Sequence, residues 1–419
     1  MFERTTLGNG LRIVTSTMPH TRSVSVGLYV GAGSRHESDE IAGVSHFLEH
    51  MLFKGTERRP TAQQISEEIE GIGGIMNAAT DKELTVYWAK VGDQHFARCI
   101  DVLSDALLNS TYAPAEIEKE RQVIIEELAS TEDSPPELAG LLIDDVLWPK
   151  QPLGRDVGGS QASVARLTRE EIVAYVRAQY SPRNTVLSVA GNVTHAEVVK
   201  RAKEHLAGWE TSPFGPMYPA TNEHPRPRVA LKSKQTEQTQ VCLGLLAYSN
   251  DHPDRYALDV LNTVLGEGMS SRLFVTIREN LALAYDVSSY VSRFQDAGSL
   301  VVSAGVDPKR VDPTIRAIRA ELSRLDEGVP EPELRKAKEF IKGRIQLRME
   351  DTRAVSSWIG AQELIRDEIL TVDEILAAIE AVTADDLLRV SRDLLATDRM
   401  HLAIVGPYRS KARFEKLLA

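Results

Sequence analysis

Cysteine is scarce in this sequence, with two residues, Cys99 and Cys242, among 419. Two cysteines cannot build a disulfide framework, so we expect a reducing compartment or a fold that is indifferent to redox conditions. No run of 18 or more apolar residues occurs, which excludes an ordinary membrane-spanning helix. Lys and Arg number 49 against 60 Asp and Glu, and the net charge of −11 argues against sequence-independent nucleic-acid binding.

A targeting segment is also missing from the N-terminal residues. They contain no basic stretch followed by an apolar core, and no presequence rich in Arg and Ser. Instead, residues 7–10 (Leu-Gly-Asn-Gly) predict a turn that enters a strand. We therefore expect a cytoplasmic protein of bacterial origin, with neither nucleic acid nor a membrane as its partner.

Repeated segments indicate that the chain is a duplication. Residues 167–173 resemble residues 382–388 at an offset of 215, and residues 25–30 resemble residues 242–247 at an offset of 217. A nearly constant offset predicts two homologous domains of about 200 residues each.

Proline marks the expected joint between these copies. Residues 212–227 contain five prolines, which disfavour helix and are typical of a linker. We therefore expect a first domain at residues 1–211, a linker at 212–227 and a second domain at residues 228–419.

The periodicity of apolar residues predicts both strands and helices in each copy. Alternation at residues 84–89 predicts a strand. Long periodic segments predict helices at residues 61–71, 94–109, 114–131, 311–326 and 331–348. We expect an α+β fold, in which each homologous domain is a mainly antiparallel sheet flanked by helices.

His46, Glu49 and His50 form the sharpest chemical pattern. At about 100° per helical residue, His50 lies about 40° from His46, and Glu49 lies about 60° to the other side. Two imidazoles one turn apart can chelate one ion, and a neighbouring carboxylate can polarise its water. The pattern alone leaves open a chance pairing of two histidines on an amphipathic helix.

A catalytic zinc ion usually needs a third protein ligand, for which the helix expected at 114–131 is the place to look. Glu120 and Glu127 share one face of that helix with Val123 and Ile124, whose apolar side chains predict that this face is buried. Glu126 points about 100° away, towards solvent. A buried carboxylate is costly without a cation, so we expect Glu127 as the ligand and Glu120 beside it.

These segments resemble the pitrilysin/insulinase family of zinc metallopeptidases, and most closely its mitochondrial-processing-peptidase-like branch of short, dimeric members. Residues 43–56 match the family's inverted zinc signature almost throughout, and residues 120–127 match its second signature. The resemblance implies a general base, Glu49, and one Zn²⁺ per chain. The ligands that it implies are His46, His50 and Glu127.

The resemblance also implies contacts with a peptide substrate. Gly74, Asn77 and Ala78 belong to a segment that looks like the family's edge strand, which receives an extended peptide by strand addition. Arg278 and Tyr285 look like the family's substrate-binding pair, in which the tyrosine would donate a hydrogen bond to the oxyanion. The implied protein is an endopeptidase for unfolded peptides, working as a clamshell homodimer or as a heterodimer with a related chain.

The second copy lacks the metal-binding pattern. At an offset of 217, the positions of His46, Glu49 and His50 correspond, in that order, to Thr263, Gly266 and Glu267. Two other functions remain open: a non-catalytic scaffold, and a metal-dependent hydrolase of non-peptide substrates. The intact ligand set argues against the first, and the strand-like segment at 74–78 argues against the second.

Overall fold

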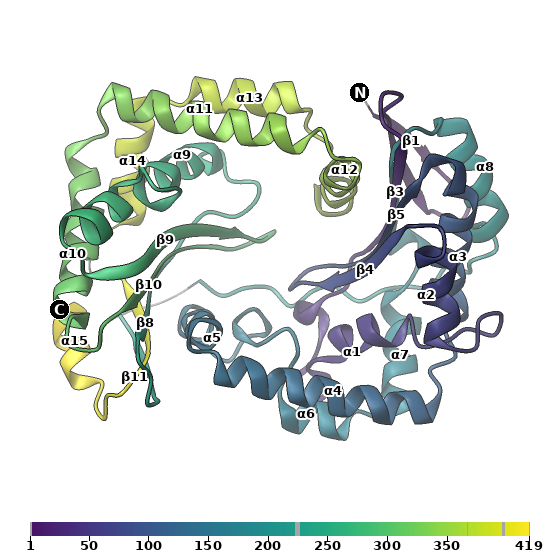
Figure 1. Cartoon of the computed structure of the whole chain (residues 1–419), viewed down its shortest axis with the longest axis horizontal. Coiled ribbons are helices and arrows are strands. Elements are labelled where there is room, and N and C mark those ends of the chain that lie inside the picture. Colours follow the sequence, from purple (N-terminus) through teal and green to yellow (C-terminus); the bar gives the residue numbers. More distant parts are fainter. Residues whose placement is uncertain (1, 223–226, 367, 396–398, 419) are drawn as a thin grey trace. The chain divides into compact units, whose positions relative to one another are not determined.

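The computed structural model describes residues 2–222, 227–366, 368–395 and 399–418. The chain forms two compact units, and each unit is assembled from three separate segments (Figure 1). The first unit comprises residues 1–128, 156–218 and 346–371. The second comprises residues 129–155, 219–345 and 372–419.

The first unit is built on a six-stranded sheet with the order β1-β2-β6-β3-β5-β4. All neighbouring strands are antiparallel except β2 and β6, which are parallel. The strands are β1 (Glu3–Thr6), β2 (Arg12–Thr17), β3 (Ser23–Val30), β4 (Ile75–Thr80), β5 (Thr85–Gly92) and β6 (Thr185–Gly191). The edge strands of the sheet are therefore β1 and β4.

Helices flank this sheet, and one long helix continues into the second unit. They are α1 (Val44–Met51), α2 (Ala62–Glu70), α3 (Phe96–Asn109), α4 (Pro114–Asp133), α6 (Gln161–Arg166), α7 (Arg169–Gln179), α8 (His195–Leu206) and α12 (Thr352–Arg366). The apolar faces of α1, α2, α3 and α8 share one buried cluster with the inner side chains of β3 and β5.

The second unit repeats this plan with five strands in the order β7-β11-β8-β10-β9. They are β7 (Val229–Ser233), β8 (Thr239–Leu246), β9 (Ala284–Arg293), β10 (Gly298–Val306) and β11 (His401–Gly406). The helices are α5 (Pro135–Leu147), α9 (Arg255–Gly266), α10 (Val311–Arg324), α11 (Glu331–Arg348), α13 (Val372–Ala381), α14 (Ala384–Leu394) and α15 (Ala412–Leu418), with a π-helical segment at Phe274–Asn280.

Five strands of the first sheet, in the order β2-β6-β3-β5-β4, correspond to the five strands of the second sheet. β7 and β11 are parallel, like β2 and β6, and the other strand pairs of the second sheet are antiparallel. The helices α7 and α14 begin with the same capping box, formed by Thr168 with Glu171 and by Thr383 with Asp386. The predicted fold class is confirmed: two homologous α+β units, each a mainly antiparallel sheet flanked by helices.

Each sheet is also covered by a helix from the other half of the chain. α12 packs on β2, β3 and β6, where Ser188 Oγ donates a hydrogen bond to the carbonyl oxygen of Ser356 at 2.7 Å. α5 packs on β8 and β11, where Ile143 and Leu147 join a buried cluster with Cys242. The chain passes from one unit to the other at five points, and one of these, between residues 218 and 219, lies in the predicted linker. The division into two contiguous domains joined at 212–227 stays a prediction.

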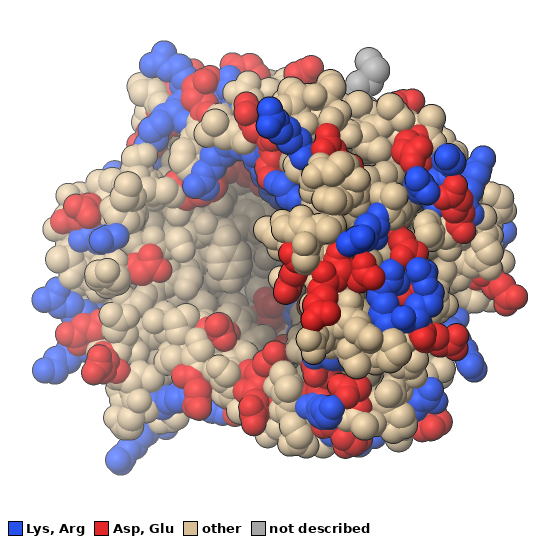
Figure 2. All heavy atoms as spheres, turned by 45° about the vertical axis from the view of Figure 1, so that its right-hand side comes forward, with Lys and Arg blue, Asp and Glu red and all other residues tan. Residues whose placement is uncertain are grey.

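The predicted helices are confirmed within a few residues of their expected ends. α2, α3, α4, α10 and α11 correspond to the five segments selected by their periodicity. Within the described part of the chain, no helix combines the length and the apolar character needed to cross a bilayer. Figure 2 shows basic and acidic side chains close to one another at many places on the surface. Ion pairs in the first unit include those that Arg58 and Arg59 form with Asp101.

Candidate functional site

Helix α1, which carries both histidines of the predicted pattern, is anchored at its N-terminus. Gly43 precedes the helix with φ of +95°, a conformation that favours glycine. The carboxylate of Glu37 accepts hydrogen bonds from the backbone N–H groups of Gly43 at 2.7 Å and Ser45 at 2.8 Å. Glu37 is fully buried, and a negative charge at a helix N-terminus is stabilised by the helix dipole. This cap fixes where the helix starts, and hence which face presents the two imidazoles.

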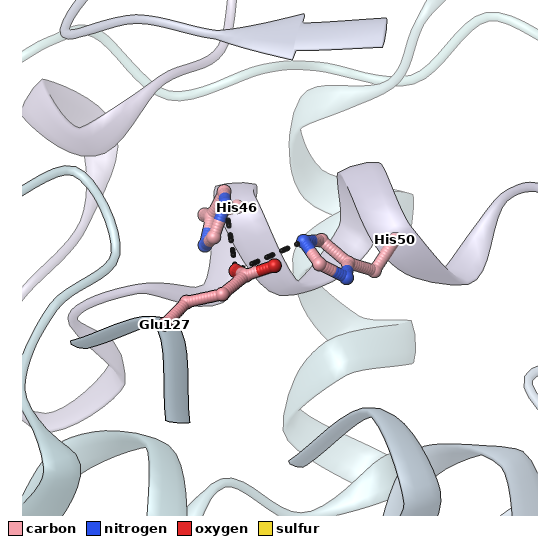
Figure 3. A group of neighbouring side chains, drawn as sticks. All are labelled: His46, His50 and Glu127. Carbon is pink, nitrogen blue, oxygen red and sulfur yellow. Dashed lines mark ion pairs between the residues drawn. The ribbon is translucent and has the colours of Figure 1, made fainter. Parts of the chain in front are cut away.

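Three side chains from two helices converge in front of α1 (Figure 3). Oε2 of Glu127, on α4, lies 3.9 Å from Nε2 of His46 and 3.5 Å from Nε2 of His50. One ligand atom from each side chain lies within 4.8 Å of the others, and no other group of three or more His, Cys, Asp or Glu residues meets this criterion among the described residues. Two imidazole nitrogens and one carboxylate oxygen are a donor set that fits zinc.

A second carboxylate orients His50 from behind. Nδ1 of His50 lies 3.0 Å from Oε2 of Glu120, and the other oxygen of Glu120 lies 2.6 Å from Nζ of Lys54. Because a carboxylate can only accept, Nδ1 of His50 carries the proton and donates it. In the neutral imidazole the lone pair is then on Nε2, which faces Glu127 at 3.5 Å, the arrangement in which a histidine binds a metal ion.

His46 has a different environment from His50. Among the described residues, its buried Nδ1 has no hydrogen-bond partner, and a Cβ at Gly158 would be in ordinary van der Waals contact with this nitrogen at 3.5 Å. Burial lowers the pKa of His46, and the neighbouring His50 lowers this pKa further. Both effects favour the neutral imidazole, which is the form that binds metal ions.

Glu49 lies on the same helix as the two histidines and is half-buried. It does not belong to the group of three converging ligands. Its negative charge adds to the effect of burial in raising the pKa of Tyr87 and Tyr180, whose hydroxyls form a 2.8 Å hydrogen bond. Glu49 therefore lies beside the ligands and next to a buried tyrosine pair.

The buried face of α4 differs in part from the prediction. Glu120 and Ile124 are buried as expected, whereas Val123 is 41% exposed and the Glu127 side chain is 49% exposed. Expecting Val123 and Glu127 on a buried stripe was wrong, because burial follows Ile117, Glu120, Ile124 and Leu128, one residue further round the helix. Glu127 lies at the flank of that stripe, facing the histidines rather than the core. Glu126 is exposed, as predicted.

The predicted peptide-binding segment forms β4, at the edge of the first sheet. Successive residues of an antiparallel strand direct their backbone N–H and C=O groups alternately towards and away from the paired strand. Asp81 N–H donates to the carbonyl oxygen of Leu84, so the backbone groups of Ala78, three positions earlier, point away from β5. In the structure, Ala78 N–H donates to Oδ1 of Asn77 at 2.8 Å. Gly74, which precedes the strand, has a packing role, because a Cβ there would lie 2.8 Å from Ile69.

Arg278 and Tyr285 lie together in the second unit, while the three converging ligands lie in the first. The Arg278 guanidinium stands 5.3 Å from the ring centroid of Tyr285 and 4.7 Å from that of Phe274, at cation–π distances. Tyr285 is 74% exposed and, with Arg278, lines a shallow pocket of about 450 Å³. The pair therefore presents a hydroxyl and a cation to the surface of its own unit.

In the part of the second copy that the structure describes, no equivalent ligand set is present. Thr263 on α9 donates a hydrogen bond to Glu267 at 3.1 Å, and Gly266 ends that helix. Glu267 also lies 3.3 Å from Arg344. The glutamate at the position of His50 is therefore engaged by a hydroxyl and a guanidinium.

Two residues with clear roles at the site had no role in the sequence prediction. Lys54 stands four positions after His50, and this spacing could have indicated that it lies near Glu120. Glu37 lies seven positions before Val44, the first residue of α1, and one short helical turn at Asp39–Ile41 separates it from the helix that it caps. No periodic pattern relates Glu37 to α1.

Comparison with known proteins gives two family matches and many similar chains. The family model described as Insulinase (Peptidase family M16) matches residues 12–161, and the one described as Peptidase M16 inactive domain matches residues 166–341. An "uncharacterized zinc protease" of Streptomyces coelicolor is 40% identical over 418 residues, covering 97% of this chain and 90% of the relative. The "uncharacterized zinc protease YmxG" of Bacillus subtilis is 36% identical, covering 97% of this chain and 98% of the relative.

A solved structure supports the same assignment at the level of the fold. The crystal structure of a protease from Helicobacter pylori superimposes with a TM-score of 0.92 at 24% identity, covering 97% of this chain and 99% of that chain. Models of one family match both copies of the duplication, and relatives match almost the whole chain. The family predicted from the sequence is therefore confirmed. The chain belongs to the insulinase family of peptidases, M16.

Proposed function

We propose that this chain is a zinc-dependent endopeptidase that cleaves extended or unfolded peptides. The observation that carries the proposal is the convergence of His46, His50 and Glu127, with Glu49 on the same helix. The names of the bacterial relatives, zinc proteases, agree with it. Zinc, when bound by these three side chains, supplies a Lewis acid that polarises the scissile carbonyl and makes water more acidic.

Glu49 is the proposed general base. It accepts a proton from the attacking water and later gives this proton to the leaving amine nitrogen. Glu120 supports the site by holding the proton of His50 on Nδ1.

The proposed substrate is a peptide in an extended conformation. An added strand would pair with the outward backbone groups of β4 around Asn77 and Ala78, replacing the hydrogen bond between these two residues. Backbone pairing recognises conformation more than sequence, so unfolded segments are favoured over folded proteins.

We further propose that the enzyme is a homodimer located in the cytoplasm. Tyr285 would donate a hydrogen bond to the oxyanion, and Arg278 would hold the tyrosine ring in place. The resemblance to short, dimeric members suggests that this pair serves the zinc site of the partner protomer. Closed two-fold dimers are also the commonest oligomers. A heterodimer with a related chain would use the same arrangement.

Metal analysis combined with peptide cleavage tests the proposed function. The purified chain should contain close to one zinc per protomer and cleave an unfolded reporter peptide, but not the same segment inside a folded protein. Removing zinc with a chelator should abolish cleavage, and adding zinc back should restore it. Bound zinc without cleavage of any peptide would favour a scaffold, whereas cleavage of small esters but not peptides would favour a non-peptide hydrolase.

A further inference from the structure

We infer that Lys54 is a positioning residue of the metal site, acting through Glu120 on His50. The inference rests on the proposed zinc binding and assigns a role to a residue outside the ligand set. Nζ of Lys54 lies 2.6 Å from Oε1 of Glu120, while Oε2 of the same carboxylate lies 3.0 Å from Nδ1 of His50. One buried carboxylate thus joins a lysine to a metal-binding imidazole.

The backbone holds Lys54 in place. Its N–H donates to the carbonyl oxygen of Met51, in the turn that ends α1. The same turn is tied to the loop before α4, because Ser110 Oγ donates to the carbonyl oxygen of Leu52 at 2.9 Å and Thr111 N–H donates to that of Gly55 at 3.1 Å. The lysine side chain is 28% exposed, unlike a freely solvated surface lysine. These contacts direct it at α4 rather than at solvent.

The charges around Glu120 explain why a cation is needed there. Glu120 is 6% exposed, and a buried carboxylate is costly unless it is paired. The other nearby cations of α4 are engaged elsewhere, since Lys119 pairs with Glu116 and Arg121 pairs with Glu118. Among the described residues, Lys54 is the lysine or arginine that pairs with Glu120. Its charge compensates the carboxylate and fixes which oxygen faces His50.

Removing this charge should weaken metal binding without removing a ligand. In Lys54→Met, Glu120 loses the partner that orients it, and its hold on His50 loosens. Loss of partners that orient metal ligands typically costs about 10–100-fold in metal affinity. Zinc affinity, measured by competition with a chromogenic chelator, should fall by that factor, whereas Lys54→Arg should restore most of it. Lys119→Met, which removes an exposed lysine from α4, is the matched control and should bind zinc like the wild type.

A double-mutant cycle separates action through Glu120 from a general loss of stability. In a Glu120→Ala background, Lys54→Met should change zinc affinity by less than about twofold, since the coupled partner is gone. An equal loss in both backgrounds, or wild-type affinity of the single variant, would overturn the inference. Circular dichroism of the metal-free variants checks folding, and Lys54→Gln replaces Lys54→Met if the latter does not fold. Wild-type protein that binds no zinc would instead refute the proposed function itself.

Discussion

Oε2 of Glu127 lies within 4 Å of Nε2 of both His46 and His50, although the Glu127 side chain is half exposed. The neighbouring Glu126 is also exposed and does not belong to the converging group. The contrast between these two adjacent carboxylates is therefore one of direction rather than of burial, and it makes the choice of the third ligand testable.

Glu127→Gln is expected to lose zinc and peptidase activity together, because an amide oxygen is a much poorer zinc ligand than a carboxylate. Glu126→Gln is the matched control and should keep both nearly intact. Zinc content after dialysis and the initial rate of peptide cleavage should be measured on the same preparations. Similar behaviour of the two variants, or the reverse order, would show that the third ligand has been wrongly assigned.

Glu49→Gln should separate metal binding from chemistry. Glu49 lies outside the group of three ligands, so the variant should retain stoichiometric zinc and still bind peptide. Turnover should fall by a factor of about 10²–10⁴, the usual contribution of a general base. Metal analysis, peptide-binding anisotropy and kcat together test this expectation. Loss of zinc from this variant would identify Glu49 as a ligand and would remove it as the general base.

The stability of the fold should depend on pH through His36. Burial lowers the pKa of His36 from its ordinary value of 6.5 to about 4, and its Nδ1 accepts a hydrogen bond from the Gly33 N–H at 3.2 Å. Between these two pKa values the unfolded chain binds more protons than the folded one. Stability therefore falls as the pH decreases from about 6.5 to about 4, by roughly 3 kcal/mol over the whole range.

Urea unfolding of metal-free protein at pH 7 and pH 5 measures this effect. The wild type should lose about 2 kcal/mol more between these pH values than His36→Gln, which has no imidazole to protonate. Carboxylates with lowered pKa values, such as Asp101 and Asp105, change the free energy of unfolding mainly at more acidic pH. Their effect is the same in the wild type and in His36→Gln. The same loss of stability in both proteins would show that His36 titrates normally in the fold.

Much of the fold could be predicted because its signals are local and repeated. The periodicity of apolar residues predicted that α2, α3, α4, α10 and α11 exist, although the buried face of α4 differs in part from the expected one. The repeat at an offset of about 215 residues predicted two homologous units, and their matching sheets confirm it. The packing of α5 and α12 on the sheets of the other halves had no such signal, since local periodicity does not reveal which sheet a helix covers.

The candidate site was predictable to the extent that its residues lie close in sequence. His46, Glu49 and His50 fall within one and a half turns of a helix, so their common face follows from helical geometry. Apolar neighbours were a poor guide to Glu127, because Val123 lies at the exposed flank of α4 and not in the core. The pairing of Lys54 with Glu120 spans 66 positions, and no local pattern indicates that the fold places the turn after α1 beside α4.

The last prediction concerns the proposed sharing of active sites between two protomers. Glu49 lies in the first unit, while Arg278 and Tyr285 lie in the second. If each zinc site uses the tyrosine of the partner, two inactive homodimers should complement each other. Glu49→Gln and Tyr285→Phe are the suitable variants, because each removes one proposed chemical group and leaves the proposed metal ligands unchanged.

Mixing these variants and allowing the subunits to exchange provides the test. In a mixed dimer, one site collects both defects and the other site is wholly wild type. Random exchange makes about half of the dimers mixed, so roughly a quarter of all sites should regain activity under two-fold symmetry. Native mass spectrometry should verify the exchange. A mixture of wild type with Glu49→Gln relates the measured cleavage rate to the fraction of wild-type sites. If mixed dimers form and no activity returns, then each protomer uses its own tyrosine, because the mixed dimer would then contain one defect in every site.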